Sequence, residues 1–198
     1  MPYEYDAFFS YKRDRESDVW HETVKKKLEY WLKQELQKAD VKIFFDTEDI
    51  STGRRWREKL TSALKGSRCI ICLWSPLYFQ SKWCVSEWMT FVQRETFVKQ
   101  NKQIAELVMP ASYFDGDSFP PDAKARQKLD FSEYASTMPK FWDTELAVKF
   151  ENERLRRFAH DLAELIRKAP PYDEAFPVVE VKEEQVESEK PIGRPANG

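Results

Sequence analysis

Short, almost continuously apolar segments recur along the chain and are separated by longer stretches of mixed character. The clearest cover residues 5–11, 41–46 and 68–74, with weaker ones at residues 104–110 and 128–134. Runs of this length without polar alternation are typical of strands that are covered on both faces of a parallel sheet. The last segment is expected to be a short edge strand.

Between these segments, apolar residues recur every three or four positions, as they do on one face of a helix. The first helix is expected to begin after Ser17 as N-cap, and the second to end at Gly66 in a left-handed conformation. A third begins near Ser81, and a final amphipathic helix spans residues 144–168. Alternating strands and helices predict right-handed crossovers and an α/β fold with an open parallel sheet.

Length and composition set outer limits on organisation and partners. The 198 residues, 41% of them hydrophobic, are expected to form one domain over residues 1–170, followed by an acidic, disordered tail over residues 171–198. A net charge of -2 argues against nucleic-acid binding. No segment approaches the roughly 20 apolar residues of a membrane span. With three cysteines and no signal peptide, a cytoplasmic location without membrane partners is expected.

Several kinds of active site require residues that the sequence does not provide. Its five glycines form neither G-x-G-x-x-G nor a Walker loop. His21 and His160 are expected on surface helices far apart in the sequence, so Ser–His and Cys–His catalysis would lack a base. Cys69 and Cys72 lie three apart within an expected strand, and their side chains would point to opposite faces. They are interpreted as core residues, and no metal site is expected.

Polar side chains follow three expected strands at their carboxyl ends, the edge at which open α/β sheets bind ligands. Lys12 and Arg13 follow the first strand and suit a diphosphate, and Asp46 ends the second. The helix after the third strand contains SKWCVSEW, in which Trp83 and Glu87 lie four apart and share a helical face. An indole beside a carboxylate excludes water and raises its pKa. This arrangement suits a carboxylate that faces a developing positive charge.

Each of these residues also has a plain structural explanation. Trp83 can simply pack, and Asp46 can cap a turn. Lys12 and Arg13 can form a solvated end of the strand, and Glu87 taken alone can be an exposed helical glutamate.

Three sequence blocks, in order and at matching spacing, resemble the Toll/interleukin-1 receptor (TIR) family. YDAFFSYKRD resembles its first conserved box, and FFDTEDISTGRRWREKLTSAL resembles the second box with the BB loop and the following helix. CIICLWSPLYFQSKWCVSEW resembles the third strand and the W-x-x-x-E helix of TIR domains that cleave NAD. The resemblance covers roughly residues 3–168. It implies a flavodoxin-like sheet of five parallel strands with helices on both faces.

The resemblance also implies roles for individual residues. Glu87 occupies the position of the catalytic glutamate. The expected substrate-binding residues are Ser10, Tyr11, Lys12, Arg13, Asp46 and Trp83, although Tyr11 can also be a purely structural cover. Lys12 departs from the paired arginines of an animal axonal enzyme, and the BB loop lacks the proline that adaptor TIR domains often carry. NAD⁺ is expected as the substrate, with no cofactor and no metal.

The function implied by the resemblance is that of an NAD⁺ glycohydrolase or cyclase in bacterial immune (anti-phage) or cell-death signalling. Such enzymes are activated by self-assembly through TIR–TIR contacts. The sequence shows no evident sensor domain, so a separate sensor or effector protein is an expected partner. One alternative is a non-enzymatic TIR adaptor that acts through the BB loop. Another is an enzyme of similar fold that acts on nucleosides, such as a deoxyribosyltransferase.

Overall fold

The fold is an open parallel sheet with helices on both faces, as shown by a computed structural model that describes residues 2–14, 17–46, 54–100 and 105–180. The sheet has five strands in the order β2-β1-β3-β4-β5, and every neighbouring pair is parallel. This order belongs to the flavodoxin-like class, so the expected fold is confirmed. The strands are β1 (Ala7–Tyr11), β2 (Ile43–Phe44), β3 (Ile70–Trp74), β4 (Val108–Ser112) and β5 (Leu129–Asp130).

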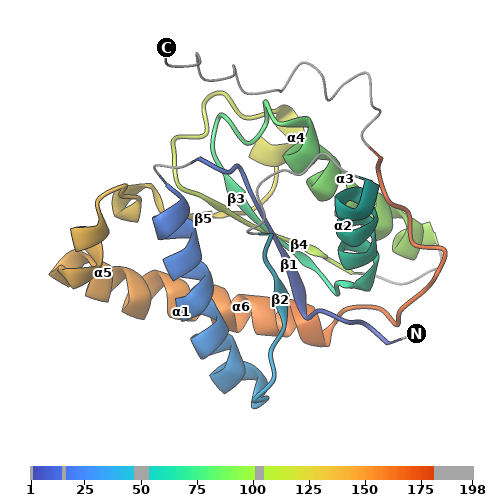
Figure 1. The fold of residues 1–198 in the computed structure, drawn as a ribbon, viewed down its shortest axis with the longest axis horizontal. Coiled ribbons are helices and arrows are strands. Elements are labelled where there is room, and N and C mark those ends of the chain that lie inside the picture. The colour runs from blue at the N-terminus through green and yellow to red at the C-terminus, as the bar shows by residue number, and fades with distance from the viewer. Residues whose placement is uncertain (1, 15–16, 47–53, 101–104, 181–198) are drawn as a thin grey trace, which may run out of the picture.

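Two groups of helices cover the sheet (Figure 1). One face packs on α1 (Asp18–Leu36) and on the final helical segment, and the other packs on α2 (Arg54–Gly66) and α3 (Lys82–Gln100). The shorter elements are α4 (Pro121–Lys124) and the 3-10 turns η1 (Ser132–Tyr134) and η2 (Pro139–Asp143). The final segment is continuous, as expected, but its middle is a π-helix: α5 (Glu145–Lys149), η3 (Phe150–Leu155) and α6 (Arg156–Arg167).

The central strand β3 is apolar at every position because alternate residues point to opposite faces and both faces are covered. Ile71 packs with the α1 and α6 side, and its neighbour Ile70 packs with the α2 and α3 side. Cys69 and Cys72 divide between the two cores in the same way, and both are fully buried free thiols. The interpretation of these cysteines as core residues is therefore confirmed.

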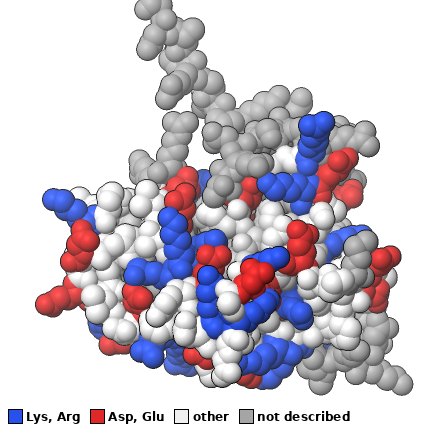
Figure 2. Space-filling view, turned by 60° about the horizontal axis from the view of Figure 1, so that its bottom comes forward, with Lys and Arg blue, Asp and Glu red and all other residues white. Residues whose placement is uncertain are grey.

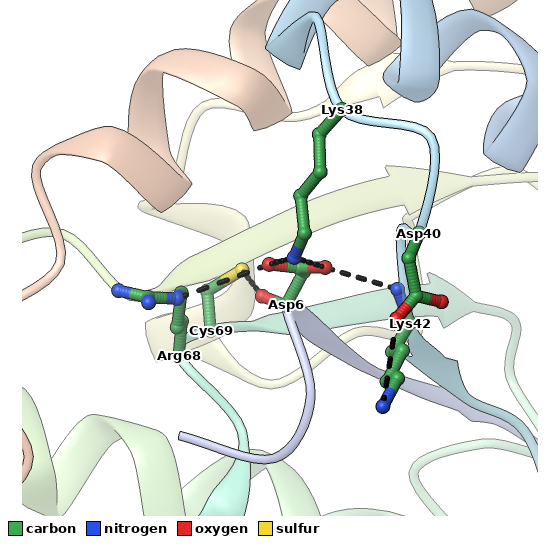
Figure 3. A network of polar contacts seen from close by, with 6 residues as sticks. All are labelled: Asp6, Lys38, Asp40, Lys42, Arg68 and Cys69. Atoms are coloured by element: carbon green, nitrogen blue, oxygen red, sulfur yellow. Dashed lines mark hydrogen bonds and ion pairs between the residues drawn. The ribbon is translucent and has the colours of Figure 1, made fainter. Parts of the chain in front are cut away.

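A buried carboxylate ties the amino ends of the strands together (Figure 3). Asp6 precedes β1 and is 5% exposed. Its oxygens accept bonds from Lys38 Nζ at 3.0 and 2.9 Å and from the backbone N–H of Lys42 at 2.9 Å, and Arg68 Nε lies 3.9 Å away. The bonds satisfy an anion that would otherwise be costly to bury. They join β1 to the segments that lead into β2 and β3.

Two sequence-based expectations about single residues are wrong. Gly66 does not adopt a left-handed conformation: its carbonyl instead accepts the N–H groups of Glu4 at 2.9 Å and Tyr5 at 3.0 Å. His21 is not on the surface but is fully buried, with its ring 4.8 Å from that of Tyr11. Burial lowers the pKa of His21 to about 3, so the ring is neutral. Ser17 takes its expected N-cap position, but its side chain makes no capping bond.

The chain beyond α6 is packed on the domain as far as Val179, where a disordered tail from residue 171 was expected. Phe176 is 3% exposed, and its ring lies 6.0 Å from that of Phe97 and 4.6 Å from the Arg94 guanidinium. The backbone N–H of Val179 donates to Thr90 Oγ1 at 3.0 Å. The expectation failed because a few apolar side chains anchor a segment of mostly polar composition. Residues 181–198 lie outside the described part of the chain.

Arg94 links this segment to the core. Its guanidinium is fully buried and donates to the carbonyls of Leu64 and Ser67, both at 2.8 Å, at the end of α2. The ring of Phe176 therefore covers a cation that satisfies the carboxyl end of a helix.

Charged side chains of both signs are interspersed on the face shown in Figure 2. None of the helices within the described ranges is both long and apolar enough to span a membrane.

The packing of Phe176 predicts that its loss destabilises the whole domain. Phe176→Ala should lower the free energy of unfolding by about 3 kcal/mol, since it removes a buried aromatic ring. Urea denaturation of the full chain measures the change. Phe114→Ala is the matched control because Phe114 is 52% exposed, and it should change the same quantity by less than about 0.5 kcal/mol. Equal effects of the two substitutions would contradict the packing of this segment.

Candidate active site

The carboxyl ends of β1 and β2 meet the first turns of α3 around a small cavity of about 70 Å³. Six of the seven expected site residues line it; only Ser10 lies behind the wall. The lining residues are Phe8, Phe9, Tyr11, Lys12, Arg13, Asp46, Trp56, Ser81, Trp83, Cys84 and Glu87. The fold therefore brings together residues that are up to 79 positions apart in the sequence, from Phe8 to Glu87.

Glu87 is the buried acid of this cavity. It lies in the second turn of α3 and is 9% exposed. Ser10 Oγ, at the end of β1, lies 2.6 Å from its Oε2. Burial raises the pKa of Glu87 to about 8; the bond to Ser10 and the charge of Arg13 lower it, and the charge of Asp46 raises it. The carboxyl is therefore largely neutral at pH 7, with its ionisation only about one pH unit higher.

Two further contacts of buried hydroxyl groups lie behind Glu87, and the sequence did not indicate them. Ser10 is 1% exposed, and its Oγ lies 2.8 Å from the hydroxyl of Tyr78. Tyr78 is fully buried and donates to the carbonyl oxygen of Cys84 at 3.0 Å. No local pattern marks Tyr78, because its partner Ser10 is 68 positions away in the sequence.

Arg13 and Asp46 form the charged side of the cavity. Arg13 Nη2 lies 3.0 Å from Asp46 Oδ2, and the indole N–H of Trp56 donates to the same oxygen at 2.8 Å. The Tyr11 hydroxyl donates to the backbone carbonyl of Asp46 at 3.2 Å. Asp46 therefore orients Arg13, and Tyr11 fixes the chain at the end of β2.

Two indoles form the apolar wall. Trp83 and Trp56 meet edge to face, with ring centroids 4.8 Å apart. Trp83 and Glu87 line the same cavity, as their spacing on the helix predicts. The contact of Trp56 with Asp46 depends on the tertiary fold, and no local pattern in the sequence indicates it.

Two larger cavities adjoin this site. One of about 320 Å³ shares Lys12 with it and extends along the same sheet edge towards Leu77 and Phe114. Another of about 600 Å³ shares Trp83 and lies between α2, α3 and residues 178–180. The carboxylates of this second cavity, Glu58 and Glu180, are exposed. The small cavity is the better candidate for chemistry because its acid is buried.

The BB loop, residues 47–53, lies outside the described ranges. Among the residues that are described, no group of three or more His, Cys, Asp or Glu side chains could hold a metal ion.

Comparison with known families and structures identifies the class of protein. Residues 8–142 match the family model of the TIR domain, and the chain therefore belongs to this family. No match was found among curated proteins.

Two solved structures are similar. A metazoan TIR-STING receptor from C. gigas, in complex with 2',3'-cGAMP, aligns with 86% of this chain and 41% of its own, at 19% identity and a TM-score of 0.50. The chain thus spans less than half of that receptor. The TIR domains of the activated Roq1 resistosome, which directly recognises the pathogen effector XopQ, align over 81% and 84% at 17% identity and a TM-score of 0.33. At these identities the likeness concerns the fold alone.

The burial of Glu87 predicts a pH-dependent stability. The pKa in the folded chain, about 8, lies above the ordinary value of 4.5. The contribution of the neutral carboxyl to the free energy of unfolding is therefore fully present below pH 4.5 and is lost as pH rises towards 8. The amide introduced by Glu87→Gln cannot ionise. The free energy of unfolding of this variant, taken relative to that of the wild type, should therefore rise by on the order of 4 kcal/mol between about pH 5 and 9.

Urea denaturation at several pH values measures this difference. Glu153→Gln is the control, because Glu153 is an exposed glutamate within η3, and its difference from the wild type should not vary with pH. A constant difference for Glu87→Gln as well would contradict the buried position of its carboxyl.

Proposed function

We propose that this TIR domain cleaves the bond between nicotinamide and ribose in NAD⁺, with Glu87 as the catalytic carboxylate. The observation that carries the proposal is the place of Glu87, buried against Ser10 in a cavity with an indole wall and two cationic side chains. This is the ligand-binding edge of a flavodoxin-like sheet.

The chemistry needs little besides a well-placed negative charge. The C1′–N1 bond breaks with its electron pair moving to the pyridinium nitrogen, so nicotinamide leaves as a neutral molecule and needs no acid. Positive charge moves onto the ribose as an oxocarbenium ion, which a carboxylate stabilises. The oxygen of water, or a nucleophile within the substrate, then bonds to C1′, and a proton is released. The products are nicotinamide and ADP-ribose or a cyclic isomer.

Glu87 must be ionised to do this, and the substrate supplies the reason. A pKa of about 8 leaves the carboxyl largely neutral in the empty site at pH 7. The cationic nicotinamide ring favours the charged form when it enters the cavity. Because water is largely excluded, the attraction between the carboxylate and the ribosyl cation is much stronger than it is at a protein surface.

The cations favour a dinucleotide over a bare nucleoside. Arg13 is oriented by Asp46, and Lys12 lines both the small cavity and the one of about 320 Å³. A ligand that extends from Glu87 past Lys12 would place its diphosphate beside these two side chains and the rest of the molecule in the larger cavity.

Membership of the family supports a proposal for the biological setting. TIR domains act in immune signalling and associate with one another, and we propose that this chain acts in a bacterial anti-phage or cell-death response. Activity then depends on self-assembly. A separate sensor protein would trigger the assembly, or a separate effector protein would act downstream of it. An adaptor role without catalysis is the second candidate.

Incubation of the purified protein with NAD⁺ tests the catalytic role. The wild type should release nicotinamide, and Glu87→Ala should lower the rate by at least about a hundredfold, since it removes the charge that stabilises the transition state. Chromatography of nicotinamide and ADP-ribose isomers follows both the rate and the product.

Glu153→Gln, at an exposed position remote from the cavity, is the control and should keep the wild-type rate. Full activity in Glu87→Ala would refute the assignment. Self-association without NAD⁺ cleavage would favour the adaptor, and cleavage of nucleosides but not of NAD⁺ would favour a deoxyribosyltransferase-like enzyme.

Self-assembly predicts a dependence on protein concentration. Specific activity should rise at least about tenfold from dilutions that hold monomers to those that hold oligomers, because head-to-tail contacts between copies would complete the site. Light scattering reports the assembly state at each dilution while nicotinamide release reports the rate. Equal specific activity across this range would show that a single copy suffices.

A further inference from the structure

Three short oxygen–oxygen contacts connect the candidate catalytic carboxyl to the backbone of its own helix. Glu87 Oε2 lies 2.6 Å from Ser10 Oγ, which lies 2.8 Å from the Tyr78 hydroxyl, which lies 3.0 Å from the carbonyl oxygen of Cys84. Ser10 and Tyr78 are buried, so water does not compensate for a missing bond.

A count of protons distinguishes the two states of this chain of contacts. Each contact needs one proton between its oxygens, and the carbonyl of Cys84 cannot donate. The two hydroxyls supply two protons, so one of the three contacts stays empty while Glu87 is ionised. With Glu87 protonated, Glu87 donates to Ser10, Ser10 donates to Tyr78, and Tyr78 donates to Cys84. Only this state fills all three contacts.

We infer that Tyr78 is a positioning residue that acts through Ser10 to hold Glu87 in its protonated form while the cavity is empty. When a cation enters, the carboxyl proton passes to solvent at the mouth of the cavity. The Ser10 hydroxyl then turns from Tyr78 to Glu87 and donates to the carboxylate. The inference rests on the proposed function for its role in catalysis, but the proton count does not.

Burial and neighbouring charges also shift the pKa of Glu87, and their influence must be separated from that of Tyr78. Burial raises the pKa of Glu87, the charge of Asp46 raises it further, and the charge of Arg13 lowers it. These influences remain when Tyr78 is replaced by Phe, because the substitution removes one oxygen and no charge. Several titratable groups face Glu87 or line its cavity. They come from the ends of β1 and β2, from β3, from the loop after β3 and from α3. These groups are Lys12, Arg13, Asp46, Cys72, Tyr78 and Cys84.

Two variants test the proton count through the titration of Glu87. Tyr78→Phe removes two filled contacts from the protonated state but only one from the ionised state, so the carboxyl should ionise at lower pH. The shift should be about 0.5 to 1 pH unit, the effect of one hydrogen bond. Ser10→Ala also removes two filled contacts from the protonated state and one from the ionised state, but that one bond is made to a charged carboxylate and is about twice as strong. The two losses nearly cancel, so the midpoint should move less than in Tyr78→Phe.

Carbon-13 NMR of the glutamate side-chain carboxyls in the full-length protein measures this titration without any need for activity. Glu87→Gln identifies the resonance, and the wild-type midpoint should lie near pH 8. The acid limb of kcat/KM for NAD⁺ should move in the same direction as the NMR midpoint in each variant. If Tyr78 had only a structural role, Tyr78→Phe would lower kcat/KM but leave the pH of its acid limb unchanged.

Tyr134→Phe is the matched control. Tyr134 is 1% exposed, and its hydroxyl has no hydrogen-bond partner in the part of the chain that the structure describes. Its replacement should leave both the midpoint and the limb unchanged.

An unshifted or raised midpoint in Tyr78→Phe would overturn the inference, as would a downward shift in Ser10→Ala larger than that in Tyr78→Phe. If the NMR midpoints move as expected but the wild type does not cleave NAD⁺, the proposed function fails and the hydroxyl chain stands.

Discussion

The carboxyl group of Glu87 is held out of water by the helix that bears it. Buried residues occupy nearly every side of α3, among them Trp88, Phe91 and Arg94. The helix therefore cannot rotate to bring Glu87 to the surface, and within the described residues Glu87 lines the small cavity at the ends of β1 and β2. The raised pKa, the contact with Ser10 and the candidate chemistry all follow from this one placement.

The parallel sheet supplies the rest of the site by geometry. Its strands all point the same way, so the segments after β1 and β2 and the helix after β3 converge at one edge. The amino ends are fixed independently by the bonds of Asp6 with Lys38 and Lys42. This separation leaves the carboxyl edge free to carry side chains that lower stability, because the core and the opposite edge support the fold.

The sequence predicted the sheet because burial on both faces leaves a visible mark, a run of apolar residues such as 68–74. It also predicted that Trp83 and Glu87 share a face, since helical spacing is local. It could not show that Tyr78 lies behind Ser10 or that Trp56 holds Asp46, because those contacts join distant parts of the chain. His21 was misjudged by its polar type, although it lies three residues before Val24 and seven before Leu28 on the buried side of α1. Phe176 was misjudged because the surrounding composition is mostly polar and charged.

Burial of an acid lowers the stability of the fold at alkaline pH, and the proposed reaction gives this cost a purpose. An exposed glutamate would be ionised at all times, but water would screen it from the ribosyl cation. A buried glutamate with a satisfied proton is neutral at rest, and its ionised form is poorly solvated by the protein. A developing cation is then the best available partner for that form, so the interaction is strongest where positive charge is greatest, in the transition state. The hydroxyls of Ser10 and Tyr78 set the free energy that separates the neutral carboxyl from its ionised form before the substrate arrives.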